Sequence, residues 1–191
     1  MKRNLLTILF IIISIIASAQ RAEKDSIIKR MPIVDGKIVY SDSITVNGHT
    51  AVQLDSAAKK WFRSYFLYTD NKAGAPNSTT STVYNRGVFE FKCMPGYMNI
   101  PFYGILTMQI TCHNDSYSYR IFNIYFRPHN GFLNAVGFER DPNYLISLYN
   151  KKHLSFGEAW RVDKHEIRGY LVGVDGAVRT CIASLNKAMA N

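Results

Sequence analysis

Residues 102–127 have the sequence FYGILTMQITCHNDSYSYRIFNIYFR, in which apolar and polar side chains alternate on both sides of Asn114-Asp115-Ser116. Alternation with a period of two predicts β-strands with one buried face, and an Asn-Asp-Ser sequence between two such runs predicts a tight turn. We therefore expect a hairpin of strands 102–113 and 117–127. On the first strand the expected inward residues are Phe102, Leu106, Met108, Ile110 and Cys112, and on the second Phe122, Ile124 and Phe126.

The pattern extends in both directions from this hairpin. Residues 82–93 and 37–46 also alternate and predict two more strands. Residues 52–68 instead place Leu54, Trp61 and Phe62 on one helical stripe, and 69–81 predict a flexible surface loop.

After a second loop at 128–143, we expect a short helix over 143–151 and a long one from about Val162 or His165 to about Ala188. Glycines at 169, 173 and 176 lower the helix propensity, so the sequence leaves open whether this helix is continuous or has a kink or break there. The fold class is α+β: an antiparallel sheet of about four strands in β-α-β-β-β order, with helices on one face and a long C-terminal helix.

The first nineteen residues have the pattern of a secretory signal peptide. Lys2 and Arg3 precede an apolar run, and Ala17-Ser18-Ala19 is a small-residue cleavage site. The run is shorter than the roughly 20 residues needed to span a bilayer. We predict cleavage after Ala19, a flexible lead-in at 20–36 and a single domain at 37–191, located in the periplasm or outside the cell without a transmembrane segment.

Charge and cysteines restrict the function only weakly. The chain has 23 Lys and Arg against 14 Asp and Glu, a net charge of +9 without any basic run, so an envelope protein or anionic glycan is a better candidate partner than nucleic acid.

Cys93 and Cys112 are expected at opposite ends of a hairpin, on the order of 30 Å apart, and therefore unbonded to each other. Cys181 could reach one of them.

The order strand, helix with Leu54, Ala57, Trp61 and Phe62, polar loop and three alternating strands, including Tyr117 to Phe126, resembles an exported family called domain of unknown function 4468. The resemblance covers about half of the chain and implies a TATA-binding-protein-like fold. That family has no assigned activity, so the resemblance implies no functional residue.

We find no motif for catalysis, for metal binding or for a cofactor. No nucleotide-binding glycine motif, paired histidine motif or G-x-S-x-G occurs. Cys112 and His113 are adjacent in a strand and should point to opposite faces, which disfavours a nucleophilic pair. We expect no enzyme, no bound metal and no cofactor.

The outward side of the sheet is the candidate binding face, since tyrosine and arginine are favoured at binding surfaces. Its expected residues are Tyr84, Arg86, Lys92, Tyr103, Tyr117, Tyr119, Tyr125 and Arg127. The first hypothesis is a non-enzymatic binding module of the cell envelope. The alternatives are an assembly component that forms a homodimer or larger oligomer through this face, and an unrecognised hydrolase.

Overall fold

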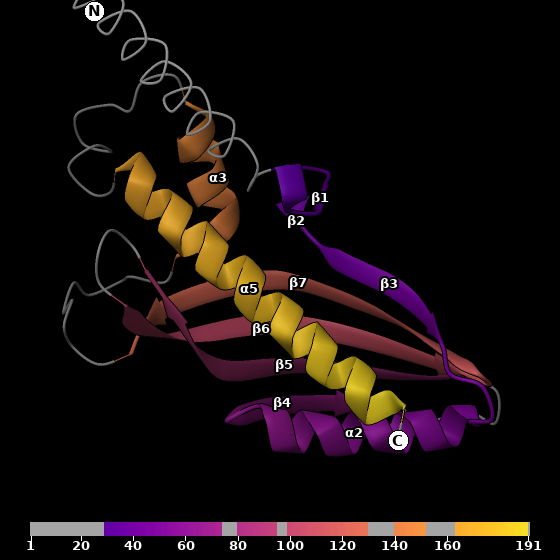
Figure 1. Cartoon of the computed structure of the whole chain (residues 1–191). Coiled ribbons are helices and arrows are strands. Elements are labelled where there is room, and N and C mark those ends of the chain that lie inside the picture. Colours follow the sequence, from indigo (N-terminus) through magenta and orange to yellow (C-terminus); the bar gives the residue numbers. More distant parts are fainter. Residues whose placement is uncertain (1–28, 74–79, 95–98, 130–139, 152–162, 191) are drawn as a thin grey trace, which may run out of the picture. The chain divides into compact units, whose positions relative to one another are not determined.

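The computed structural model describes residues 29–73, 80–94, 99–129, 140–151 and 163–190. The chain divides into two units, 1–31 and 32–191, and all of the elements below belong to the second. Its centre is a five-stranded antiparallel sheet in the order β3-β7-β6-β5-β4 (Figure 1). The predicted fold class is therefore confirmed, with one strand more than expected.

A small hairpin precedes the sheet. Strands β1 (Ile33–Val34) and β2 (Lys37–Ile38) pair through Asp35 and Gly36, which both have positive φ, as a type I′ turn requires. This hairpin lies partly within the segment that we expected to be a flexible lead-in. Strand β3 (Tyr40–Thr45) then forms one edge of the main sheet by pairing with β7.

Helix α2 (Ala51–Tyr65) begins at a capping box. The Thr50 hydroxyl accepts from the Gln53 N–H, and the Gln53 side chain accepts from the Thr50 N–H in return. Leu54, Trp61 and Phe62 are buried, so the helical stripe predicted from the sequence is confirmed.

The prediction for the segment after α2 was wrong. Residues Tyr68–Ala73 form the edge strand β4, paired with Val83–Val88, although 69–81 were expected to be a loop. The sequence from Thr69 to Lys72 is polar and resembles a loop, because an edge strand needs little apolar surface. Residues 74–79 of the expected loop, and most of the loop at 128–143, lie outside the described residues.

Three long strands complete the sheet: β5 (Thr80–Cys93), β6 (Ile100–His113) and β7 (Ser116–Pro128). The register places Cys93 opposite Ile100 and Cys112 opposite Ser81, so these two cysteines lie at opposite ends of the β5–β6 hairpin, as predicted. Cys93, Cys112 and Cys181 are all buried and free.

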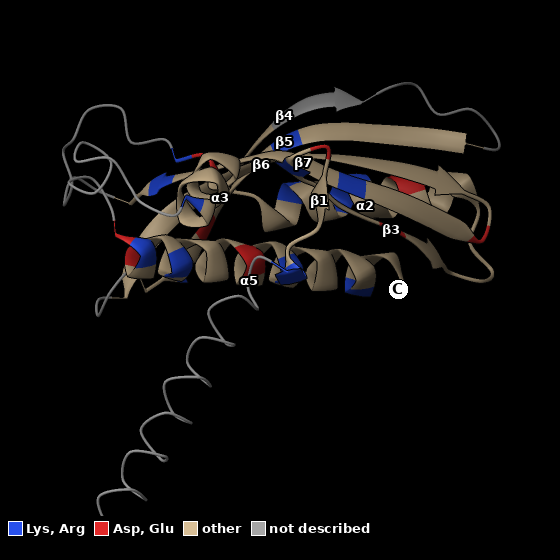
Figure 2. Cartoon of the chain, turned by 90° about the horizontal axis from the view of Figure 1, so that it is seen from above, with Lys and Arg blue, Asp and Glu red and all other residues tan. Residues whose placement is uncertain are grey.

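Helix α2 and the long C-terminal helix cover one side of the sheet, which we call the inner face. Helices α3 (Pro142–Asn150) and α5 (Lys164–Met189) follow β7, and Figure 2 shows α5 running along this side. Helix α5 is continuous through Gly173 and Gly176. A β-carbon added to Gly173 would overlap Cys93 of β5, so the absence of a side chain allows the helix to pack closely on the sheet.

Three hydrogen bonds between elements hold α5 in place. The Tyr40 hydroxyl donates to Asp175 at 2.8 Å, the Tyr117 hydroxyl to Asn186 at 2.7 Å, and the Trp61 indole to Ser184 at 3.0 Å. Because they come from β3, β7 and α2, they fix the helix at several points along its length. Because α2 and α5 cover the inner face, the opposite side of β5, β6 and β7 is the surface on which we look for a site.

Candidate binding face

We call the side of the sheet opposite α2 and α5 the outer face. Strand register determines which side chains lie there, because alternate residues point to alternate sides. Six of the predicted site residues lie on the outer face: Tyr84, Arg86, Lys92, Tyr103, Tyr125 and Arg127. The three cationic residues are exposed, Tyr84 is 39% exposed, and the other two tyrosines are half-buried.

The predicted orientation of Tyr117 and Tyr119 was wrong. Tyr117 lies opposite Cys112 and is fully buried on the inner face, and Tyr119 lies opposite Ile110 with 8% of its surface exposed. Burial raises the pKa of both phenols above the usual value for tyrosine. Both side chains belong to the core, and neither can form part of a surface on the outer face.

A β-bulge in β7 is the reason for this error. Thr107 pairs with Phe122 and Ile105 with Tyr125, so Asn123 and Ile124 together lie opposite one residue of β6. Asn123 has a φ of 50°, a left-handed conformation that asparagine tolerates better than most residues. The extra residue reverses the alternation, so odd-numbered residues point inward before the bulge and even-numbered ones after it.

The bulge brings two residues to the outer face that the sequence analysis missed. The Phe122 ring, expected inward, lies 6.2 Å from the Tyr84 ring between centroids. The guanidinium carbon of Arg120 lies 5.1 Å above the Phe122 ring, within cation–π range. The adjacent apolar residues Ile121 and Phe122, followed by Asn123, are the sequence signal that could have revealed the bulge.

A second cluster surrounds Tyr103 at the other end of the face. Arg127 lies with its guanidinium carbon 5.7 Å from the Tyr103 ring centre, and the His129 ring lies 4.4 Å away between centroids. His129 Nε2 is 3.2 Å from a carboxylate oxygen of Glu90. Glu90, Tyr103 and Arg127 are direct cross-strand neighbours on β5, β6 and β7. Side chains from three strands therefore hold one another in a defined arrangement.

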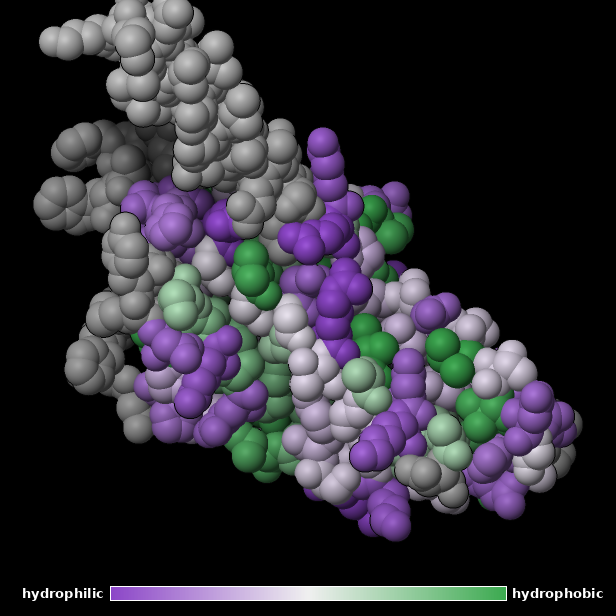
Figure 3. Space-filling model, in the orientation of Figure 1, coloured by the Kyte–Doolittle hydropathy of each residue, from purple (hydrophilic) through white to green (hydrophobic). Residues whose placement is uncertain are grey.

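The outer face is positively charged. On β5, β6 and β7 it has the cationic residues Arg86, Lys92, Arg120 and Arg127, and Glu90 is its one carboxylate among the described side chains of these strands. On the opposite, helical side, Figure 3 shows hydrophilic and hydrophobic residues interspersed.

The buried thiols are poor candidates for nucleophilic chemistry. Burial raises the pKa values of Cys93, Cys112 and Cys181 to about 12 each, so the thiols stay protonated near neutral pH. Cys112 is fully buried whereas His113 is exposed, which confirms that this pair points to opposite faces. Within the described ranges, no group of three or more His, Cys, Asp and Glu side chains is placed to hold a metal ion.

Two solved structures resemble this chain. A TBP-like protein from Parabacteroides distasonis superposes with a TM-score of 0.62 and 13% identity, covering 84% of this chain and 97% of its own. A DUF4468 family protein from Bacteroides ovatus gives a TM-score of 0.54 and 15% identity over 84% of this chain and 91% of its own. The chain thus has a TATA-binding-protein-like fold, and the resemblance expected from the sequence is confirmed at the level of the fold.

Sequence comparisons add no further relatives: no family profile and no curated protein matches the chain. Among the residues that the structure describes, no helix has both the length and the apolar character needed to cross a membrane.

Proposed function

We propose that this protein is an exported, non-enzymatic binding protein that holds an acidic glycan on the outer face of its sheet. The observation that carries the proposal is the pair of arginines, Arg120 and Arg127, each lying over an aromatic ring, on three strands whose one described outer-face carboxylate is Glu90.

The chemistry of these residues suits a carboxylate-bearing ligand. A guanidinium group presents a planar set of donors that matches a carboxylate in a bidentate manner, and stacking on a ring limits its freedom before binding. The rings of Phe122 and Tyr103 offer apolar surface for the faces of sugar rings, and the tyrosine hydroxyl adds a polar group. Arg86 and Lys92 enlarge the positive field around both clusters.

The proposed location rests on the first nineteen residues. A short basic start, an apolar run and a small-residue cleavage site together favour export. Export would bring the protein to the acidic polysaccharides of the cell surface, which is why we propose an anionic glycan as the ligand in preference to nucleic acid.

The test is calorimetric titration of the purified protein with a galacturonic acid hexamer, with a neutral maltohexaose as the reference ligand. We expect binding of the acidic sugar alone. The double variant Arg120→Ala/Arg127→Ala should weaken it about tenfold or more, since a charge-assisted hydrogen bond contributes roughly 1.5–3 kcal/mol. The matched control Lys60→Ala/Arg63→Ala, which removes two exposed cations from α2, should bind as the unmodified protein does.

Equal losses of affinity in both variants would mean that net charge, and not the outer face, governs binding.

The alternative functions predict different outcomes of these measurements. An assembly component would form a stable dimer by light scattering that the outer-face variant dissociates. A partner protein of the envelope would leave the titration with sugar flat. A hydrolase would shorten the hexamer during the titration.

A further inference from the structure

Strand β5 is paired along only part of its length on the β4 side. Strand β4 pairs with Val83–Val88, and the Leu67 N–H donates to the Val88 carbonyl at 2.8 Å. Beyond Leu67, from Glu90 to Cys93, β5 has no neighbouring strand on that side among the described residues.

The backbone groups of Glu90 and Lys92 point toward this open edge. Lys92 lies opposite Pro101, whose carbonyl accepts from His129 of the segment that follows β7. In an antiparallel ladder, the backbone groups of two directly opposed residues either point toward each other or both point away from each other. The Pro101 carbonyl points toward the β7 side, so the N–H and C=O of Lys92 point away from β6 and toward the open edge. Glu90 is two residues earlier and has the same orientation, so two N–H and two C=O groups face outward.

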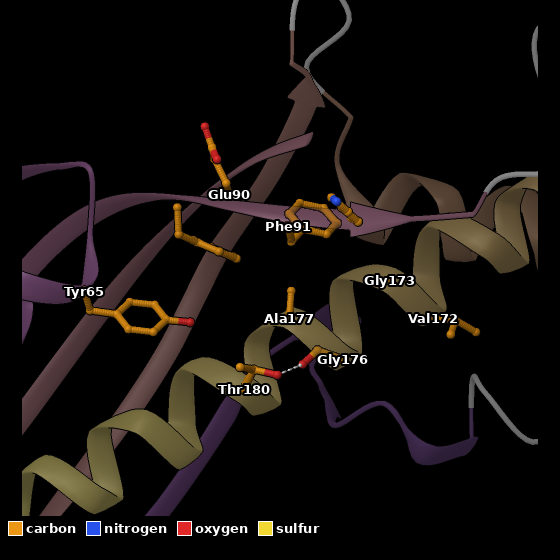
Figure 4. Close-up of a pocket in the computed structure, with 10 residues that line it drawn as sticks. Tyr65, Glu90, Phe91, Val172, Gly173, Gly176, Ala177 and Thr180 are labelled. Carbon is orange, nitrogen blue, oxygen red and sulfur yellow. Dashed lines mark hydrogen bonds between the residues drawn. The ribbon is translucent and has the colours of Figure 1, made fainter. Parts of the chain in front are cut away.

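A groove of about 470 Å³ lies beside this edge, between β5, α5 and the end of α2. Its lining includes Tyr65, Phe89, Phe91, Val172, Gly176 and Ala177. Glu90 and Lys92 also line the groove, and in Figure 4 the Glu90 carboxylate points away from α5. A β-carbon built on Gly176 would meet nothing within 4 Å, which shows that the helix leaves open space here.

We propose that this edge accepts an extended peptide segment of a partner protein as an added antiparallel strand, with apolar side chains in the groove. Unpaired strand groups select an extended backbone, and pockets beside the strand select alternate side chains. Residues opposite Phe91 and Cys93 lie on the side of the groove, whereas Leu67 already occupies the position beside Phe89. Residues opposite Glu90 and Lys92 lie on the outer side, where a basic and an acidic side chain respectively complement them.

This inference does not depend on the glycan proposal, because it uses a different surface. Charged residues on an exposed edge also discourage pairing with a second copy of the chain. The groove distinguishes the two roles, since protection against self-pairing requires no room for the side chains of an incoming strand.

The probe is the fluorescein-labelled peptide acetyl-Ser-Val-Glu-Val-Lys-Val-Ser-amide, measured by fluorescence anisotropy. We expect a dissociation constant of about 0.1 mM or tighter. Methylation of the Glu and Lys amide nitrogens, which would donate to the edge, should abolish binding. Methylation of the outer two Val nitrogens, which would point away from β5, should leave binding within about twofold.

Two variants connect the result to the groove. Gly176→Phe fills the open space and should abolish binding, whereas Ala183→Phe, at an exposed position further along α5, should not change it. No binding up to about 1 mM, equal effects of the two methylation patterns, or equal effects of the two variants would each overturn the proposal. A dimer that Gly176→Phe does not affect would instead assign the edge to a second copy.

Discussion

The indole N–H of Trp61 on α2 donates a hydrogen bond to the Ser184 hydroxyl on α5, with a nitrogen–oxygen distance of 3.0 Å. The side chain is 4% exposed, and its ring contacts those of Phe62, Tyr65 and Phe66. Burial of Trp61 was predicted from the sequence and is confirmed. The structure also shows that the Trp61 side chain connects α2 and α5, the two helices that cover the inner face.

Replacing Trp61 should therefore destabilise the fold strongly. Trp61→Ala is expected to lower the free energy of unfolding by about 3–5 kcal/mol, because it leaves a cavity and an unpaired hydroxyl. Ser184→Ala, which removes the hydrogen bond and little volume, should cost about 1 kcal/mol. Urea denaturation measures both. A loss below about 1 kcal/mol for Trp61→Ala would contradict the packing described here.

Two glycines three residues apart on α5 should respond oppositely to alanine. Gly173→Ala should destabilise the protein, because the new methyl group would overlap Cys93. Gly176→Ala should stabilise it by up to about 1 kcal/mol, because alanine has the higher helix propensity and the space is open. Thermal denaturation of the two variants provides the comparison. Stabilisation by both would show that α5 does not approach β5 at Gly173.

Stability should fall at alkaline pH. The thiols have pKa values raised from 9.0 to about 12 in the fold, so above pH 9 the unfolded chain loses protons that the folded chain retains. The stabilisation is complete below pH 9 and is lost as pH rises toward 12. Burial raises the pKa of Tyr117 as well, which acts in the same direction.

Urea midpoints between about pH 8 and pH 10.5 test this dependence. Cys181→Ala should show a shallower decline than the unmodified protein, because one buried thiol no longer contributes. Identical declines in the two proteins would indicate that Cys181 is not buried in the folded chain.

Export predicts a shortened chain. The intact mass of protein recovered from outside the cytoplasm should correspond to residues 20–191, with Gln20 as the first residue. A full-length chain that is extracted with membranes would refute cleavage and favour an N-terminal anchor.

Most of the fold could be predicted from the sequence, because apolar residues recur at every second position in the strands and at every third or fourth position in the helices. Strand β4 could not, since its polar residues acquire strand structure from pairing with Val83–Val88. Of the eight residues expected on the outward side of the sheet, six lie there. Tyr117 and Tyr119 were misplaced because β7 has apolar or aromatic residues at both parities, and the bulge at Asn123 decides which of them points inward.

The central claim is that the outer face is the binding surface, and nuclear magnetic resonance gives its most direct test. Backbone amide signals of the ¹⁵N-labelled protein would be followed during titration with the galacturonic acid hexamer. We predict saturable shifts concentrated at Tyr103, Arg120, Phe122 and Arg127, with little change at Gly176 in the groove. Shifts confined to the groove or to the exposed side of α2, or no saturable shifts, would contradict the claim.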